Sequence, residues 1–189
     1  MANLGAQAGS GLDASDITTG TLGAVTLGSS VVFPAGKVVG HTAVHHNQSS
    51  TQVLISGSIQ ELDTDLRLTY TAKSSSNKLL FQVYGWFCSP NSDGLSWAYI
   101  YETTDGIVNP PPANGSRLQV HWSKRVTASD ANDFCDMNFM VYADAPSGAK
   151  TYTIYYGTEG KQDQFFVSTL GTSSGVTAPI IFSLTEIQQ

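Results

Sequence analysis

The chain has 189 residues and a net charge of −6, from 15 acidic and 9 basic residues, and only 13% of its residues are charged. This length predicts one main domain with a single substantial core. The basic residues are scattered apart from Lys124-Arg125, which argues against nucleic-acid binding, since that needs clustered cations. The N-terminal stretch has no basic region followed by an apolar core, and no apolar run reaches about 18 residues. We therefore expect neither a signal peptide nor insertion into a membrane.

Residues 1–32 differ in composition from the rest of the chain. They are rich in Gly, Ala, Ser and Thr and contain no aromatic residue, so they cannot form a core of their own. Within this segment, the run ITTGTLGAVTLGSS at 17–30 has isolated apolar residues on a background of small ones, which we take as candidate attachment residues: Ile17, Leu22, Val25 and Leu27. Two interpretations remain open: a segment that winds with copies of itself around an axis, and a flexible tether.

Residues 33–189 predict an all-β domain. Short runs of alternating apolar and polar residues are separated by turn sequences such as SSSN at 74–77 and APSG at 145–148. The predicted strands are 37–46, 51–59, 65–71, 78–88, 95–102, 117–124, 134–143, 150–157, 163–169 and 179–188. Helix caps followed by stripes of period 3.6 are missing. The pattern is typical of an antiparallel β-sandwich or a jelly-roll-like domain.

Alternation also assigns side chains to faces of the predicted strands. In the run KLLFQVYGWFC at 78–88 both faces are apolar, so we expect this strand to be covered on both sides. Trp97, Tyr99 and Tyr101 share one face, as expected of core residues or cross-strand pairs, or alternatively of a subunit interface or a sugar-stacking platform. Cys88 and Cys135 are not in a Cys-x-x-Cys arrangement and are predicted to be buried free thiols.

Several segments, taken in order, resemble a family of small tail-fibre or spike proteins of aquatic tailed bacteriophages of the cyanophage type. The segment FPAGKVV at 33–39 resembles the entry strand FPSGxVV of that family. The segment from Leu66 to Leu80, with KSSSNKLL, resembles its TDTGLxxxITPxSSSSKILV hairpin, and SLTEI at 183–187 resembles its terminal strand. The glycine of the family's TDTG turn is absent here, where the chain reads Thr64-Asp65-Leu66.

The resemblance implies a virion structural protein that forms a homotrimer and contacts the host cell surface as a short tail fibre or spike. Its partners would be a host glycan or protein, together with tail, baseplate or capsid proteins bound through residues 1–32. Two alternatives stay open: a capsid- or baseplate-decorating (cement) protein with no receptor role, and a polysaccharide depolymerase. The motifs indicate a fold and a setting, not a reaction, so we expect no enzyme activity and no cofactor.

Three of the four histidines lie close together, at His41, His45 and His46. In a strand, His41 and His45 project from the same face about 13 Å apart, too far for one metal ion, whereas His46 projects from the other face. One chain therefore does not close a metal site from these residues. A trimer axis would do so if one histidine from each chain converged on it, although interface or surface histidines are the commoner case.

Two acidic groups are candidates for the paired carboxylates of a depolymerase or for weak Ca²⁺ ligands. Glu61, Asp63 and Asp65 alternate in ELDTD and are expected on one face of an extended segment. A second trio is Asp130, Asp133 and Asp136. Neither spacing matches a dedicated calcium loop, and acidic residues in such patterns are more often solvated side chains in loops.

For receptor binding we expect loops carried on the rigid sandwich, at 89–97, 103–116 and 157–166. The candidate residues combine polar side chains with aromatic stacking platforms: Asp93, Trp97, Tyr101, Asn109, Asn114, Trp122 and Phe165.

Overall fold

The computed structural model describes residues 35–46, 53–56, 59–88, 94–112, 119–126, 134–159, 162–165 and 180–189. Their regular elements are strands and one short 3₁₀ helix. The strands are β1 (Val38–His46), β2 (Val53–Ser56), β3 (Gln60–Glu61), β4 (Leu68–Thr71), β5 (Lys78–Cys88), β6 (Gly94–Glu102), β7 (Gly106–Ile107), β8 (Trp122–Val126), β9 (Phe134–Asp144), β10 (Ala149–Thr158), β11 (Gln162–Phe165) and β12 (Ile180–Ile187), and the 3₁₀ helix is η2 (Thr64–Leu66). No helix in this part of the chain is long and apolar enough to cross a bilayer.

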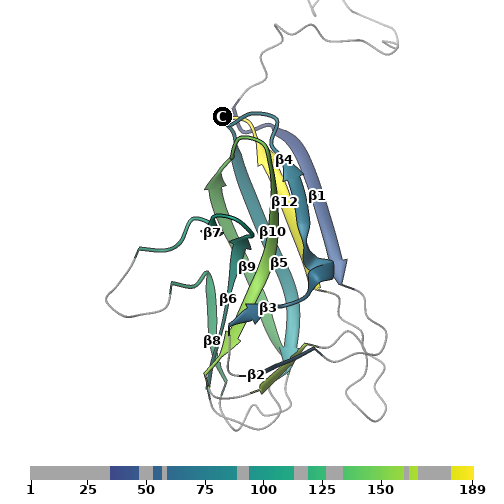
Figure 1. Cartoon of the computed structure of the whole chain (residues 1–189), viewed down its shortest axis with the longest axis vertical. Helices are drawn as coiled ribbons and strands as arrows, with labels where there is room; N and C mark the ends of the chain where they lie inside the picture. The colour runs from purple at the N-terminus through teal and green to yellow at the C-terminus, as the bar shows by residue number, and fades with distance from the viewer. Residues whose placement is uncertain are drawn as a thin grey trace, which may run out of the picture. The chain divides into compact units, whose positions relative to one another are not determined.

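The strands form two antiparallel sheets (Figure 1). In sheet A, β12 and β9 flank β5, β1 pairs with β12, and β11 joins β2 to the end of β5. In sheet B, β10 pairs with β6; β3 and β4 share the outer side of β10, and β7 and β8 share the outer side of β6. Counting β3 with β4 as one strand and β7 with β8 as another, and leaving out β2 and β11, gives eight strands that can be renumbered along the chain. Their order is 1-8-3-6 across sheet A and 2-7-4-5 across sheet B. This is the double Greek-key order of a jelly roll, so the predicted fold class is confirmed.

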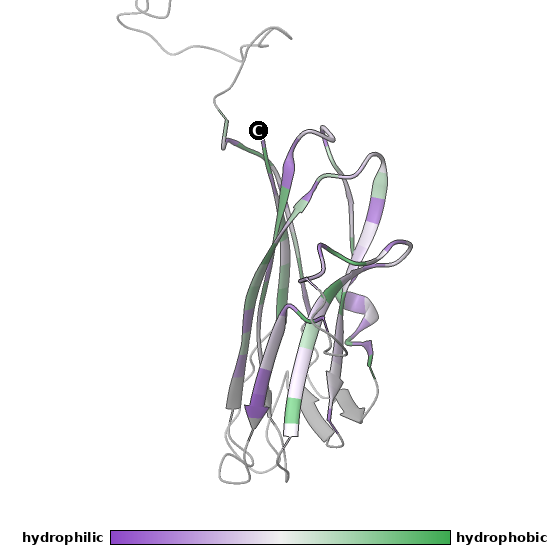
Figure 2. Ribbon diagram, turned by 90° about the vertical axis from the view of Figure 1, so that its left-hand side faces the viewer, coloured by the Kyte–Doolittle hydropathy of each residue, from purple (hydrophilic) through white to green (hydrophobic). Residues whose placement is uncertain are grey.

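The core lies between the two sheets. The inward positions of β5 are Leu79, Phe81 and Val83, all buried, and they face Ile154 and Tyr156 of β10. The rings of Phe81 and Tyr152 meet edge to face, with centroids 4.8 Å apart. Figure 2, turned to view the strands from the side, shows hydrophobic and hydrophilic residues interspersed along the same strands. Period-two alternation therefore sorts the side chains between core and surface.

Several predicted strand bounds agree closely with the structure. β5 spans 78–88 as expected; β1 and β9 differ from their predicted ranges by one residue at one end, and β12 by one residue at each end. The strand expected at 65–71 was wrong over its first residues, because Thr64–Leu66 forms η2 and the strand begins at Leu68. The cause is Asp63, which caps η2 by accepting a hydrogen bond of 2.8 Å from the backbone N of Asp65.

The predictions for the N-terminal segment 1–32 lie outside the described residues. The prediction for the two thiols concerns side chains that the structure does not describe. The register pairs Cys88 with Phe134 and Phe87 with Cys135, so the two cysteines are not directly opposite each other.

Candidate functional site

The two open sides of the sandwich carry different groups of polar residues. On one side β1, at the edge of sheet A, lies against η2, which connects β3 to β4 at the edge of sheet B (Figure 1). On the other side β9, at the opposite edge of sheet A, lies near the segment around β7. A cleft opens on the β7–β9 side, and a cluster of titratable side chains lies on the β1–η2 side.

The cleft has a volume of about 520 Å³. One wall comes from the β6–β7 turn and the residues after it, and the other from the end of β9 and the turn into β10. The lining includes aromatic, aliphatic and charged side chains, among them Phe81, Glu102, Asp105, Ile107, Tyr142 and Lys150. Such a mixture of apolar wall and a few convergent polar groups is typical of ligand sites.

Lys150 is the cation at the centre of the charged part of the cleft. Its Nζ donates a hydrogen bond of 2.5 Å to Oδ2 of Asp105 and lies 3.5 Å from Oε2 of Glu102. The hydrogen bond to Asp105 raises the pKa of Lys150, and the same bond lowers the pKa of Asp105. Burial, helped by the charges of Glu102 and Asp105, raises the pKa of Tyr152 to about 12. At neutral pH this part of the cleft therefore holds the Lys150 cation beside the Asp105 carboxylate, with Tyr152 protonated.

Glu102 is the buried carboxylate of this group. Its Oε2 accepts a hydrogen bond of 2.6 Å from the backbone N of Asp105, whereas Oε1 is buried and has no hydrogen-bond partner among the described residues. A buried acceptor without a partner costs free energy, about 1–3 kcal/mol. Glu102 thus brings a buried carboxyl group to the lining of the cleft.

Of the receptor-binding candidates whose side chains the structure describes, Asn109 lines this cleft. Its backbone is in the left-handed region, with a φ of 41°, which short polar residues tolerate better than most. Its Nδ2 donates a hydrogen bond of 2.5 Å to the carbonyl oxygen of Tyr142, which ties the segment after β7 to β9. Asn109 therefore shapes the cleft wall.

The other candidates that can be placed lie on sheet B. Trp97 is only 7% exposed, and Tyr101 is half-buried, with its ring 4.5 Å from that of Tyr155. Trp122 is half-buried, its ring 6.5 Å from that of Tyr156. Trp97, Tyr101 and Trp122 are thus packed residues in this chain, as expected for cross-strand aromatic pairs. Phe165 belongs to β11, and its side chain is outside the described part, as are Asp93, Asn114 and the attachment candidates.

A third surface is the outer face of sheet A. The outward residues of β5, β9 and β12 include exposed apolar side chains: Tyr84 is 47% exposed, Met140 68%, Tyr142 49% and Ile181 38%. They are neighbours by register, because Ile181 pairs with Tyr84, Met140 with Gln82, and Tyr142 with Leu80. We call Leu80, Tyr84, Met140, Tyr142 and Ile181 the outer patch. The described part of the chain leaves this side of β5 open, so the second cover expected for β5 does not come from those residues.

Charges on these outward positions lie at the ends of the outer patch. Lys78 and Asp144 pair with each other at one end, and Asp136 lies near the other. The outward positions between them on β5 and β9 are uncharged. The uncharged outward positions include the polar residues Gln82 and Asn138 as well as the apolar ones. Depletion of charged residues at the centre is typical of protein–protein interfaces.

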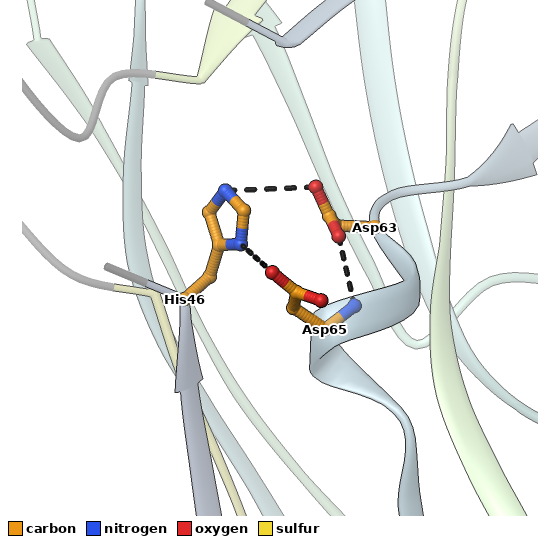
Figure 3. A group of neighbouring side chains, drawn as sticks. All are labelled: His46, Asp63 and Asp65. Atoms are coloured by element: carbon orange, nitrogen blue, oxygen red, sulfur yellow. Dashed lines mark hydrogen bonds and ion pairs between the residues drawn. The ribbon is translucent and has the colours of Figure 1, made fainter. Parts of the chain in front are cut away.

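The histidines divide between faces as the alternation predicts. His41 and His45 are exposed, whereas His46 is buried and points toward Asp63 and Asp65 (Figure 3). His121 is set apart: burial lowers its pKa, and its Nδ1 accepts a hydrogen bond of 3.0 Å from a backbone N of β6. The proximity of His46 to the two aspartates was missed from sequence, because the expected extended segment would not place both carboxylates beside β1.

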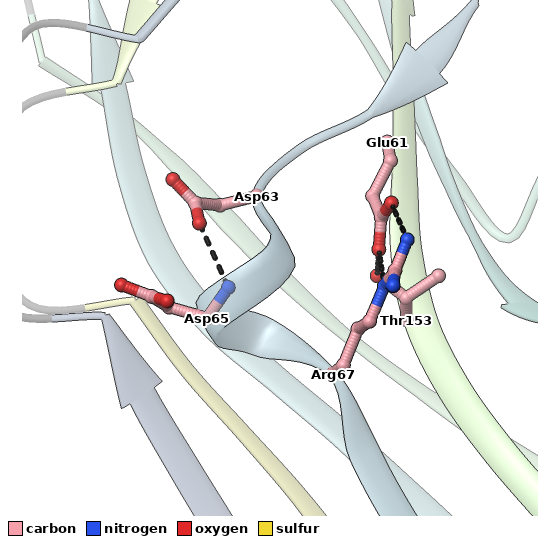
Figure 4. A network of polar contacts seen from close by, with 5 residues as sticks. All are labelled: Glu61, Asp63, Asp65, Arg67 and Thr153. Carbon is pink, nitrogen blue, oxygen red and sulfur yellow. Dashed lines mark hydrogen bonds and ion pairs between the residues drawn. The ribbon is translucent and has the colours of Figure 1, made fainter.

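Glu61 does not act with the two aspartates. Arg67 donates two hydrogen bonds to its carboxylate, of 2.8 and 2.7 Å, and Thr153 donates another of 2.7 Å (Figure 4). The hydrogen bond from Arg67 holds the pKa of Glu61 below its ordinary value, although burial opposes this. A general acid needs the opposite direction, a raised pKa. Of the second acidic trio, Asp130 and Asp133 lie outside the described residues, and Asp136 is exposed on β9.

No protein-family model matches the chain, and no curated protein matches it. Among solved structures, it is similar to the VP2 subviral particle of infectious bursal disease virus, with a TM-score of 0.37 and 9% identity over 88% of this chain and 46% of that one. It is also similar to a structure of the Gx strain of infectious bursal disease virus, with a TM-score of 0.34 and 12% identity over 89% of this chain and 41% of that one. The chain therefore spans less than half the length of these two proteins.

Proposed function

We propose that the chain is a structural protein of a virus particle that assembles with copies of itself through the outer patch and contacts the host surface as a short fibre or spike. The single observation that carries self-association is the outer patch, a group of exposed apolar side chains on a sheet whose opposite face is already buried in the core. Apolar groups of this kind on soluble proteins mark interaction surfaces.

A second copy of the chain is the occupant that we propose for the outer patch. Each copy carries a net charge of −6, so association through charged surfaces would be opposed by repulsion between like charges. The centre of the outer patch has no charged side chain, and its acidic residues stand at the ends. Association through this centre buries apolar area while keeping the carboxylates in water. The resemblance of the sequence to trimeric phage fibres supports three copies.

Host contact is assigned to the cleft between the β7 segment and β9. Asp105 accepts hydrogen bonds, Lys150 donates them, and Ile107 offers apolar surface. Saccharides need this combination, because their hydroxyls take directional hydrogen bonds while their C–H faces pack on apolar groups. Repetition of one weak site in an oligomer raises the overall affinity without any new contact. The proposal assigns no catalytic step to the cleft.

The test is adsorption of the purified full-length chain to intact host cells. We expect the wild type to adsorb, Asp105→Ala to adsorb at least tenfold more weakly, and Glu159→Ala to adsorb like the wild type. Asp105 lines the cleft and is exposed, whereas Glu159 is an exposed acid outside it. If the wild type does not adsorb, and antibodies against it label the whole capsid surface, the chain is a decoration protein and the host-contact proposal is wrong. Release of reducing sugar from host polysaccharide would instead favour a depolymerase.

A further inference from the structure

The buried imidazole of His46 lies between two carboxylates on the side of the sandwich away from the cleft. His46 is the last residue of β1, in sheet A, whereas Asp63 and Asp65 belong to the connection between β3 and β4, in sheet B. Nε2 of His46 is 3.6 Å from Oδ2 of Asp63, and Nδ1 is 3.9 Å from Oδ2 of Asp65 (Figure 3). One ligand atom from each residue lies within 4.8 Å of the other two.

His46 needs a partner that the described protein groups do not supply. Its side chain is 1% exposed, and neither ring nitrogen makes a hydrogen bond. The distances to the two carboxylates exceed the usual hydrogen-bond range of about 2.7–3.2 Å. One ion binds an imidazole through a single ring nitrogen. The 3.6 Å between Nε2 and Oδ2 of Asp63 is close to the separation of two ligands on a tetrahedral ion, which is about 3.4 Å when each ligand lies about 2.1 Å from the ion. Asp65 lies beside the other ring nitrogen, so its carboxylate reaches the same ion by rotating.

The two aspartates are arranged and charged in a way that suits a cation. Oδ1 of Asp63 caps η2 by accepting the 2.8 Å hydrogen bond from Asp65 N, which orients its Oδ2 toward His46. Arg67, the nearby cation, is engaged by Glu61 on the other side of the turn (Figure 4). Within the described part of the chain, the ion pairs of Asp63 and Asp65 are those with His46. Asp65 is 72% exposed, so its carboxylate is free to rotate inward.

We propose that His46, Asp63 and Asp65 bind one divalent transition-metal cation within each chain, with Zn²⁺ as the ion that best matches their donors. An imidazole nitrogen selects a transition metal over Ca²⁺ or Mg²⁺, and two carboxylate oxygens complete a set of three protein ligands. The exposed side of Asp65 leaves a further position to water. The ion links the edge of sheet A to the edge of sheet B, so its role is to hold the two layers together on this side.

The experiment is a calorimetric titration of the chelator-treated full-length chain with ZnCl₂, accompanied by thermal unfolding with and without the ion. We expect one Zn²⁺ per chain and a higher melting temperature when it is bound. Asp65→Ala removes an exposed side chain and keeps the fold, and we expect it to weaken Zn²⁺ binding at least tenfold. His46→Ala should abolish Zn²⁺ binding. If His46→Ala does not fold, Asp65→Ala still tests the site. His45→Ala is the matched control, because it removes the adjacent but exposed histidine.

A second measurement uses Co²⁺ as a spectroscopic probe. We expect the wild type and His45→Ala to give the same visible absorption bands of bound Co²⁺, and Asp65→Ala to lose or shift them. Three results would overturn the proposal: no Zn²⁺ binding by the wild type, unchanged binding by Asp65→Ala, or one ion per three chains that is lost in His41→Ala. The first would leave His46 as an imidazole held between two carboxylates, and the last would assign the metal to an axis between chains.

Discussion

Asn77 donates a hydrogen bond of 2.6 Å from Nδ2 to Oε1 of Glu186, across 109 positions of sequence. Glu186 is fully buried and also accepts hydrogen bonds from the hydroxyl of Tyr70 and from the backbone N of Lys73 and Ser74. The turn with the sequence KSSSN thus closes around one carboxylate of the terminal strand. The hairpin and the last strand, which carry much of the resemblance to phage fibre proteins, are parts of one structural unit.

Replacing Glu186 by Gln should destabilise the fold by about 1–3 kcal/mol at pH 7, because an NH₂ group, which cannot accept hydrogen bonds, would replace an oxygen that accepts them. Burial raises the pKa of Glu186, but the hydrogen bonds from Asn77, Tyr70, Lys73 and Ser74 outweigh it, and the net pKa is lowered. A lowered folded pKa gives stability that is present above the unfolded value, 4.5, and lost as pH falls through the folded pKa. In urea unfolding, the difference between wild type and Glu186→Gln should therefore shrink below pH 4.5.

The control for this experiment is Glu159→Gln, which changes an exposed acid and should alter the free energy of unfolding by less than about 0.5 kcal/mol. A difference between wild type and Glu186→Gln that stays the same from pH 7 down through the acidic range would contradict the assignment of a depressed pKa to Glu186.

Gly40 on β1 is required by the hydroxyl of Tyr70. A Cβ at position 40 would lie 1.9 Å from Oη of Tyr70 and 3.2 Å from its Cζ. Gly40→Ala should therefore push Tyr70 away from Glu186, at a cost of about 1–3 kcal/mol. In a Tyr70→Phe background the worst contact is gone, so the same substitution should cost less. A double-mutant cycle from urea unfolding should give a coupling of about 1 kcal/mol or more, whereas additive effects would show that the close approach does not matter.

The ion pairs of Lys150 and Lys78 should differ in their contribution to stability. Lys150 is 21% exposed and pairs with the buried Glu102, whereas Lys78 pairs with Asp144, which is 82% exposed. Removing the partner of a buried charge is costly, but exposed pairs contribute about 0–1 kcal/mol. We expect Lys150→Met to lower the free energy of unfolding by at least about 1 kcal/mol more than Lys78→Met does. Equal losses in parallel urea titrations would mean that Glu102 does not depend on Lys150.

The sequence was sufficient to predict β5 and the two faces of this strand, because alternation and turn residues are local signals. It was also sufficient to separate His46 from His45, which needs only the period of a strand. It did not predict that Asp63 and Asp65 lie beside His46. That proximity depends on η2, a turn made by one capping side chain, and on the packing of one sheet edge against the other.

The cleft was missed for a related reason. Glu102, Asp105 and Lys150 come from β6, the β6–β7 turn and β10, and no spacing in the sequence shows that Lys150 pairs with Asp105. Asn109, predicted from a loop with turn residues, does line the cleft, whereas Trp97, predicted as an aromatic platform, is packed at 7% exposure. Aromatic residues on a strand do not by themselves reveal which of them a neighbouring strand covers.

Sedimentation equilibrium of the full-length chain and of Met140→Lys tests the central claim most directly. Met140 is 68% exposed at the centre of the outer patch, so a lysine there should leave the fold intact while placing a charge in the proposed interface. We expect the wild type to be a trimer, and Met140→Lys to be a monomer with an unchanged circular dichroism spectrum. A monomeric wild type, or a Met140→Lys variant that keeps the mass of the wild-type oligomer, would contradict assembly through the outer patch.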